Sequence, residues 1–223
     1  MRNSILKKDT DQDTIMTQRL FFTDDALTAN INVISCTAHE DVFAVTVEAT
    51  PFHPQGGGQP CDLGLIGDSE VVKVLQEQDN IVHYVTQAIA PGPARAQVDA
   101  ARRHLNARLH SAGHLIGVLG EQAGWMPTKA HHWPGECRVS FTPGEDAQPL
   151  EAPAIQLQLE RWISADLPRQ LHLDSSQRAV GFGNLPSYPC GGTHVRSLSE
   201  LVAVNVLSVT LKKGVLSVRY DLN

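Results

Sequence analysis

Two pairs of residues in this sequence have the types and the spacing of metal ligands. His110 and His114 lie four residues apart in a segment whose apolar spacing predicts a helix, so both imidazoles share one helical face. Cys190 and His194 have the same spacing, but two glycines between them favour a tightly turned loop. Three imidazoles and a thiolate form a ligand set that zinc accepts in tetrahedral geometry, and the soft thiolate disfavours magnesium and calcium. We therefore predict one Zn²⁺ per chain at these four residues.

Each pair also has a simpler interpretation when it is taken alone. Two histidines at this spacing are often surface or core residues, Cys190 is compatible with a small buried hydrophobe, and His194 with a solvated loop residue. A zinc protease is disfavoured, because residue 111 is Ser and no carboxylate lies between the two histidines to act as a general base. The metal prediction therefore depends on the two pairs meeting in space.

Composition narrows the class of protein. The 223 residues are 42% hydrophobic, which suffices for one large domain or two smaller ones. The formal net charge of −6 argues against indiscriminate nucleic-acid binding, including DNA, but permits a local basic patch. We find neither an apolar run of roughly 18 residues nor a secretory signal, so we expect a cytoplasmic protein without a membrane partner. The four scattered cysteines are expected to be reduced.

Two kinds of hydrophobic period divide the chain. Short runs of alternating apolar residues between 20 and 90 predict an antiparallel sheet or small barrel, and the proline-containing stretch 90–99 predicts a linker. Apolar steps of three and four then predict a helix that starts after Asp99 and ends near Gly124. The later segments predict a second helix, two strands and a final hairpin, at 152–167, 170–174, 178–182 and 201–222.

We therefore predict an α+β fold in which an N-terminal small antiparallel β-barrel precedes an α+β domain with helices packed on an antiparallel sheet. The expected boundaries are a flexible tail at 1–17, the barrel at 18–92 and the metal-binding domain at 99–223.

Several motifs together resemble the editing domain of alanyl-tRNA synthetase and the free-standing trans-editing proteins of the AlaX type. They are "RLFFTDD" as an opening strand, "FHPQGGGQPCDLG" at 52–64, "RLHSAGHL", "PCGGTHV" and the final "VRYDL". Editing domains of threonyl-tRNA synthetase share the ligand spacings, but GGGQ favours the alanyl branch. No catalytic synthetase motif accompanies the match, which resembles the free-standing form. Ser111 and Leu198 stand where the family usually has threonine.

The resemblance implies hydrolysis of the ester bond that joins a wrongly attached serine, or glycine as a second substrate, to tRNA(Ala). It also implies zinc bound by the four predicted ligands and no obligate protein partner. Zinc would either activate water or position the substrate. The alternatives are editing of Ser-tRNA(Thr) and a non-catalytic, zinc-stapled module that binds RNA.

The remaining candidate residues follow from this chemistry. We expect the catalytic group to be His110, His114, Gln59 and Thr128, with Thr128 selecting the serine hydroxyl. We expect the substrate to contact Gly56, Gly57, Gly58, Gln59, Arg103, Gly191 and Gly192, although the triple glycine is also compatible with a plain turn. A basic cluster is expected to contact tRNA phosphates through Arg102, Arg103, Arg108, Lys129, His131, His132, Lys212 and Lys213.

Overall fold

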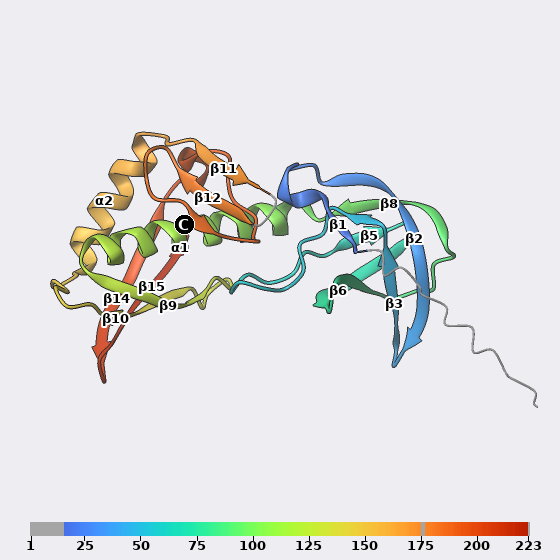
Figure 1. The fold of residues 1–223 in the computed structure, drawn as a ribbon, viewed down its shortest axis with the longest axis horizontal. Helices are drawn as coiled ribbons and strands as arrows, with labels where there is room; N and C mark the ends of the chain where they lie inside the picture. Colours follow the sequence, from blue (N-terminus) through green and yellow to red (C-terminus); the bar gives the residue numbers. More distant parts are fainter. Residues whose placement is uncertain (1–15, 175–176, 223) are drawn as a thin grey trace, which may run out of the picture.

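A computed structural model of the chain describes residues 16–174 and 177–222. Figure 1 shows two halves arranged along the long axis of the molecule, with helix α1 (Ala100–Gln122) extending from one toward the other. The second helix is α2 (Ala152–Ser164), and nearly all strand pairs are antiparallel. The predicted α+β class is therefore confirmed.

The first half is a single sheet whose pairing returns to its starting strand. In order of pairing, its strands are β2 (Thr28–His39), β3 (Val42–Val47), β7 (Asn80–Val85), β6 (Ser69–Glu77), β5 (Gly64–Ile66) and β8 (Gly92–Val98). Because β8 pairs with both β5 and β2, the ring closes into a barrel. Alternate strand residues point inward and form a core that includes Val33, Val45, Ile66 and Val85, and Phe52 from the segment between β4 and β5 packs into it.

The predicted linker at 90–99 is wrong, because most of it forms strand β8. Inward-facing Ala94, Ala96 and Val98 alternate with exposed Pro93, Arg95 and Gln97. The pattern is weak in the sequence because alanine is small and proline usually interrupts strands. The predicted division into domains remains a prediction.

The second half is built on a four-stranded sheet and a smaller three-stranded one. The large sheet has the order β14 (Val204–Lys212), β15 (Val215–Leu222), β10 (Arg138–Pro143) and β9 (Trp125–His131). The small sheet comprises β11 (Arg169–Leu173), β12 (Arg178–Phe182) and β13 (Tyr188–Pro189). A second core between these sheets and the two helices includes Leu109, Ile116, Phe141, Leu159 and Val218.

Helix α1 begins and ends where the sequence predicts. The Asp99 side chain accepts a hydrogen bond from the Arg102 amide at 3.0 Å, which caps the first turn. The helix ends before Gly124, whose φ of +80° suits glycine. None of the described helices is long and apolar enough to cross a membrane.

The start of the described chain differs from the predicted opening strand. Only Gln18–Arg19 (β1) is extended, pairing in parallel with β4 (Ala49–Thr50), and Leu20–Phe22 forms a 3-10 turn. Of the predicted tail, residues 1–15 lie outside the described part. Thr17, at its end, is buried, and its hydroxyl accepts the Ile81 amide at 3.3 Å.

Candidate metal centre

The structure brings the four predicted ligands together. The candidate ligand atoms of His110, His114, Cys190 and His194 all lie within 4.8 Å of one another. The Sγ atom of Cys190 is 3.3 Å from Nε2 of His194 and 3.6 Å from Nε2 of His110. Helix α1 supplies two of the groups, and the loop that follows β13 supplies the other two.

Gln59 orients the first of these histidines. Its Oε1 accepts hydrogen bonds from Nδ1 of His110 at 2.7 Å and from the Thr193 amide at 3.0 Å. Its Nε2 donates to Oγ1 of Thr193 at 2.9 Å, so that the fully buried amide is satisfied at both ends. Because the proton of His110 is held on Nδ1, its Nε2 lone pair faces the cluster.

Ser111 orients His194, as Gln59 orients His110. The Ser111 hydroxyl lies 3.1 Å from Nδ1 of His194 and accepts the Val195 amide at 3.2 Å. This leaves Nε2 of His194 directed at Cys190. The serine that replaces the usual threonine of the resembled family therefore supports a ligand.

The loop between Cys190 and His194 is fixed by Arg178, a residue that sequence analysis missed. Its Nη1 donates to the carbonyl of Cys190 at 2.7 Å and to that of Gly192 at 2.9 Å. Gly192 packs so closely that a Cβ there would overlap the His110 ring. The Gly192 amide also donates to Sγ of Cys190 at 3.3 Å. No local signal in "RAVGF" distinguishes this buried arginine from a surface one.

Burial keeps the imidazoles neutral and able to coordinate a cation. Desolvation lowers the pKa of His114 to about 4 and lowers the pKa values of His110 and His194 well below their usual range. Desolvation raises the pKa of the Cys190 thiol, although the Gly192 amide and Arg178 oppose this. Nδ1 of His114 is buried with no hydrogen-bond partner among the described residues. Converging lone pairs and an orphaned nitrogen are what a bound cation would satisfy, so these residues fit zinc.

The GGGQ segment forms a tight turn. Gly56 and Gln59 exchange backbone hydrogen bonds of 3.1 and 2.9 Å, and Gly57 and Gly58 between them have φ of +58° and +79°. Two positive φ values in a two-residue turn favour glycine at both positions. The Gly58 carbonyl accepts the amide of His132 at 2.9 Å, so this glycine is used inside the protein. The GGGQ segment is therefore a tight turn between Gly56 and Gln59, and Gly58 in this turn also packs against the chain at His132.

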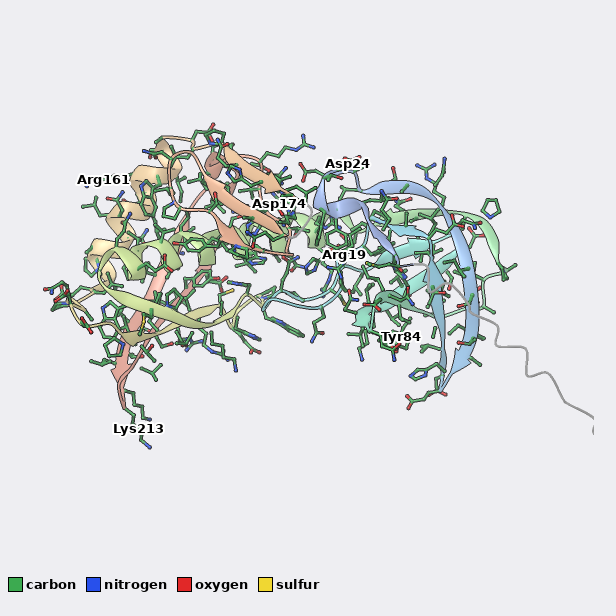
Figure 2. All side chains as sticks on the ribbon, in the orientation of Figure 1. Arg19, Asp24, Tyr84, Arg161, Asp174 and Lys213 are labelled. Atoms are coloured by element: carbon green, nitrogen blue, oxygen red, sulfur yellow. The ribbon has the colours of Figure 1, made fainter. Side chains whose placement is uncertain are left out.

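Two cavities meet at this turn. The larger, of about 460 Å³, is lined by three of the four ligands, His110, His114 and Cys190. Small or apolar residues complete its wall, among them Gly113, Gly117, Pro127, Ala130 and Val139. The smaller, of about 220 Å³, is lined by Arg19, His53, Gln55, Gln76 and the edges of both glycine loops. Gly57 and Gly191 line both cavities, so the two are adjacent. Figure 2 shows Arg19 near the junction of the two halves of the molecule.

Two predicted site residues lie elsewhere. Thr128 is exposed at a bulge of β9, where Ser140 pairs with Lys129 and Phe141 pairs with Pro127. Its hydroxyl donates to the Ser140 carbonyl at 3.1 Å, and Thr128 is not among the described residues that line the larger cavity.

Arg103 serves the protein interior rather than a phosphate. It is 7% exposed, and its guanidinium donates to the Asp62 carboxylate and to the Pro51 carbonyl. The neighbouring arginines also donate to backbone carbonyls, Arg102 to Cys61 and Arg108 to Leu201. Of the predicted basic cluster, Lys129, Lys212 and Lys213 are exposed, and Figure 2 shows Lys213 at the tip of the β14–β15 hairpin.

His132 joins the site in a way that its sequence context does not reveal. Its ring stacks on His110 with a centroid distance of 4.4 Å and lines the larger cavity. Nδ1 of His132 lies 2.6 Å from the Tyr220 hydroxyl. The sequence suggested a phosphate contact because His132 follows His131 and Lys129, but the side chain is 2% exposed.

No protein-family model matches the chain. The chain is 29% identical over 189 residues to a protein named alanyl-tRNA editing protein Aarsd1 from Rattus norvegicus, covering 74% of this chain and 45% of that protein. It is 28% identical over 188 residues to the protein of the same name from Danio rerio. It is 27% identical to an alanine–tRNA ligase from Methanoregula boonei, covering 76% of this chain and 22% of the ligase. The predicted resemblance is thereby confirmed, and the chain spans less than half of each relative's length.

Proposed function

We propose that this chain is a zinc-dependent hydrolase that deacylates misacylated alanine tRNA, releasing free serine, or glycine as a second substrate, and intact tRNA. The observation that carries the proposal is the convergence of His110, His114, Cys190 and His194, three of which line a cavity of about 460 Å³. The names of the relatives support the choice of tRNA(Ala).

The cavities suit an amino acid attached to a nucleotide. The larger one has small walls at Gly113, Gly117 and Ala130, which fit a short side chain. The smaller one, across Gly57 and Gly191, offers Arg19 and Gln55 to a ribose, base or phosphate. An ester placed at the junction would put its amino acid beside the cluster and its nucleotide beside the GGGQ turn.

Groups of the chain itself would orient the metal ligands and stabilise the negative charge that develops on the ester carbonyl. A bound zinc ion would supply a Lewis acid for the ester carbonyl or an anchor for the substrate amine. Gln59 and Ser111 hold His110 and His194 in the orientation that such an ion needs. The amides of Gly57 and Gly191 have no acceptor among the described residues, and they line the junction where oxyanion charge would develop.

One observation favours the non-catalytic alternative. Four protein ligands complete a tetrahedral zinc sphere, as in structural sites. Cys190, like His114, is only partly buried and lines the cavity, and its loop is the element that a substrate would displace. A purely structural zinc requires no such cavity, so we favour the hydrolase.

A side-by-side deacylation assay tests the proposal. Zinc-loaded protein is given Ser-tRNA(Ala), Ala-tRNA(Ala) and Ser-tRNA(Thr), and the released amino acid is measured. We expect rapid release from Ser-tRNA(Ala) only. Faster release from Ser-tRNA(Thr) would favour the threonine alternative, and no release from any substrate by protein with intact circular dichroism would favour the RNA-binding module.

A further inference from the structure

His132 is held rigidly against the metal cluster by contacts on three sides. Its backbone amide donates to the Gly58 carbonyl at 2.9 Å, and its ring stacks on His110 at an interplanar angle of 24°. On the third side a Cβ on Gly113 would overlap Cε1 of the ring. The side chain is 2% exposed and lies in the wall of the larger cavity.

Tyr220 determines which ring nitrogen of His132 carries the proton. The Tyr220 hydroxyl donates its single proton to the Leu109 carbonyl, which can only accept, at 3.0 Å. The hydroxyl must therefore accept from Nδ1 of His132, 2.6 Å away. In the neutral ring this leaves Nε2 without a proton and with a lone pair.

That lone pair has no donor among the residues that the structure describes. The hydrogen bond of the His132 ring to the described residues is made through Nδ1, and Nε2 is left facing the cavity that the ring lines. The surrounding cavity wall includes Gly113, Ala130 and Val139, which have no side-chain donor, and Tyr188, whose hydroxyl already donates to Glu121. A nearly buried acceptor in such a wall favours a ligand that brings a donor of its own.

We propose that Nε2 of His132 accepts a hydrogen bond from the side-chain hydroxyl of the seryl substrate, and that Tyr220 positions His132 for this. The inference rests on the proposed function and replaces Thr128 as the selecting residue. An alanyl ester would place a methyl group against Nε2 and leave this acceptor without a hydrogen bond. A site that binds a substrate hydroxyl in this way discriminates strongly against the analogue that lacks the hydroxyl. A glycyl ester lacks a side chain and leaves space for a water molecule to donate instead.

Two substitutions at His132 separate this role from a structural one. His132→Asn keeps a donor at the level of Nδ1 for Tyr220 and removes the acceptor, whereas His132→Gln places an amide oxygen near the position of Nε2. The matched control is His172→Asn on β11, where the side chain is exposed. Zinc content and thermal unfolding are measured for every variant.

We expect kcat/KM for Ser-tRNA(Ala) to fall by about 100-fold in His132→Asn, with the slow rate on Ala-tRNA(Ala) changed less than about threefold. His132→Gln should recover about tenfold of that loss, and Tyr220→Phe should lower only the seryl rate, by about tenfold. Variants with normal zinc content that lose both rates equally, or neither rate, would overturn the inference.

The same assays distinguish a failure of the proposed hydrolase activity from a failure of the role assigned to His132. Wild-type protein that hydrolyses neither ester would contradict the function itself and this inference with it. Wild-type protein that prefers Ser-tRNA(Ala) but keeps its preference in His132→Asn would contradict only the role of His132.

Discussion

Oε1 of Gln59 lies 2.7 Å from Nδ1 of His110, although 51 residues separate them in the sequence. The contact joins the glycine turn beside the barrel to the helix that carries two metal ligands. A group expected to contact substrate is therefore a positioning residue for a ligand. Any movement of the turn on tRNA binding would reach the metal cluster directly.

Removing the Gln59 amide should weaken zinc binding without removing a ligand. In Gln59→Leu the His110 ring loses the acceptor that fixes its orientation, and we expect zinc affinity to fall by about 10- to 100-fold. Competition with a chelator of known affinity measures this. Gln87→Leu, on an exposed residue of the barrel, is the matched control and should bind zinc as the wild type does.

Ser111 should act through its hydroxyl alone. We expect Ser111→Ala to lower zinc affinity by about tenfold, because Nδ1 of His194 loses its partner, while Ser111→Thr keeps the hydroxyl and the affinity. The same chelator competition applies to both variants. Equal affinities in the alanine and threonine variants would contradict this role.

The buried ion pair between Asp62 and Arg103 should be a stability determinant. Asp62 is fully buried, and its Oδ2 accepts the Arg103 guanidinium and the His53 amide. Asp62→Ala leaves the arginine charge unpaired, which typically costs about 3–5 kcal/mol. Urea unfolding measures the loss.

Asp41→Ala, at an exposed turn, is the control for Asp62→Ala and should change stability by less than about 0.5 kcal/mol. A similar small loss in Asp62→Ala would show that the pair contributes little to the junction between the barrel and α1.

His83 should make the protein sensitive to acid. Burial lowers its pKa to about 4 in the folded barrel, where its Nε2 lies 2.8 Å from the Thr50 hydroxyl. The unfolded chain binds this proton below about pH 6.5, so stability is present above that pH and is lost as pH falls toward 4. The full effect is about 3 kcal/mol.

Urea unfolding of the wild type and His83→Gln between pH 4 and 7 checks this expectation. In His83→Gln the free energy of unfolding should fall less steeply as pH falls, by a slope equivalent to about one proton. His39→Gln, on an exposed strand end, should keep the wild-type slope of stability against pH. Parallel slopes for all three proteins would contradict the assigned protonation of His83.

The metal ligands could be predicted because their signals are local. The spacing of His110 and His114 on a helix, and the glycines between Cys190 and His194, each specify a geometry within a few residues. The Asp99 cap is equally local, and the structure contains it. Such features need no knowledge of the tertiary fold.

The groups that orient the ligands could not be predicted, because they come from distant parts of the chain. Gln59 reaches Thr193 across 134 residues, and His132 reaches Tyr220 across 88. The predicted roles of Arg103 and Thr128 assumed exposed surfaces toward the substrate. In the fold Arg103 finds a buried carboxylate, and a bulge turns Thr128 toward its neighbouring strand.

Zinc titration of metal-depleted protein tests the central claim most directly. Release of serine from Ser-tRNA(Ala) and the X-ray absorption of the zinc are followed together as metal is added. We predict that activity rises in proportion to zinc, stops rising at one ion per chain, and accompanies a shell of three nitrogens and one sulfur. Full activity in the metal-free protein, or a zinc shell without sulfur, would contradict the account.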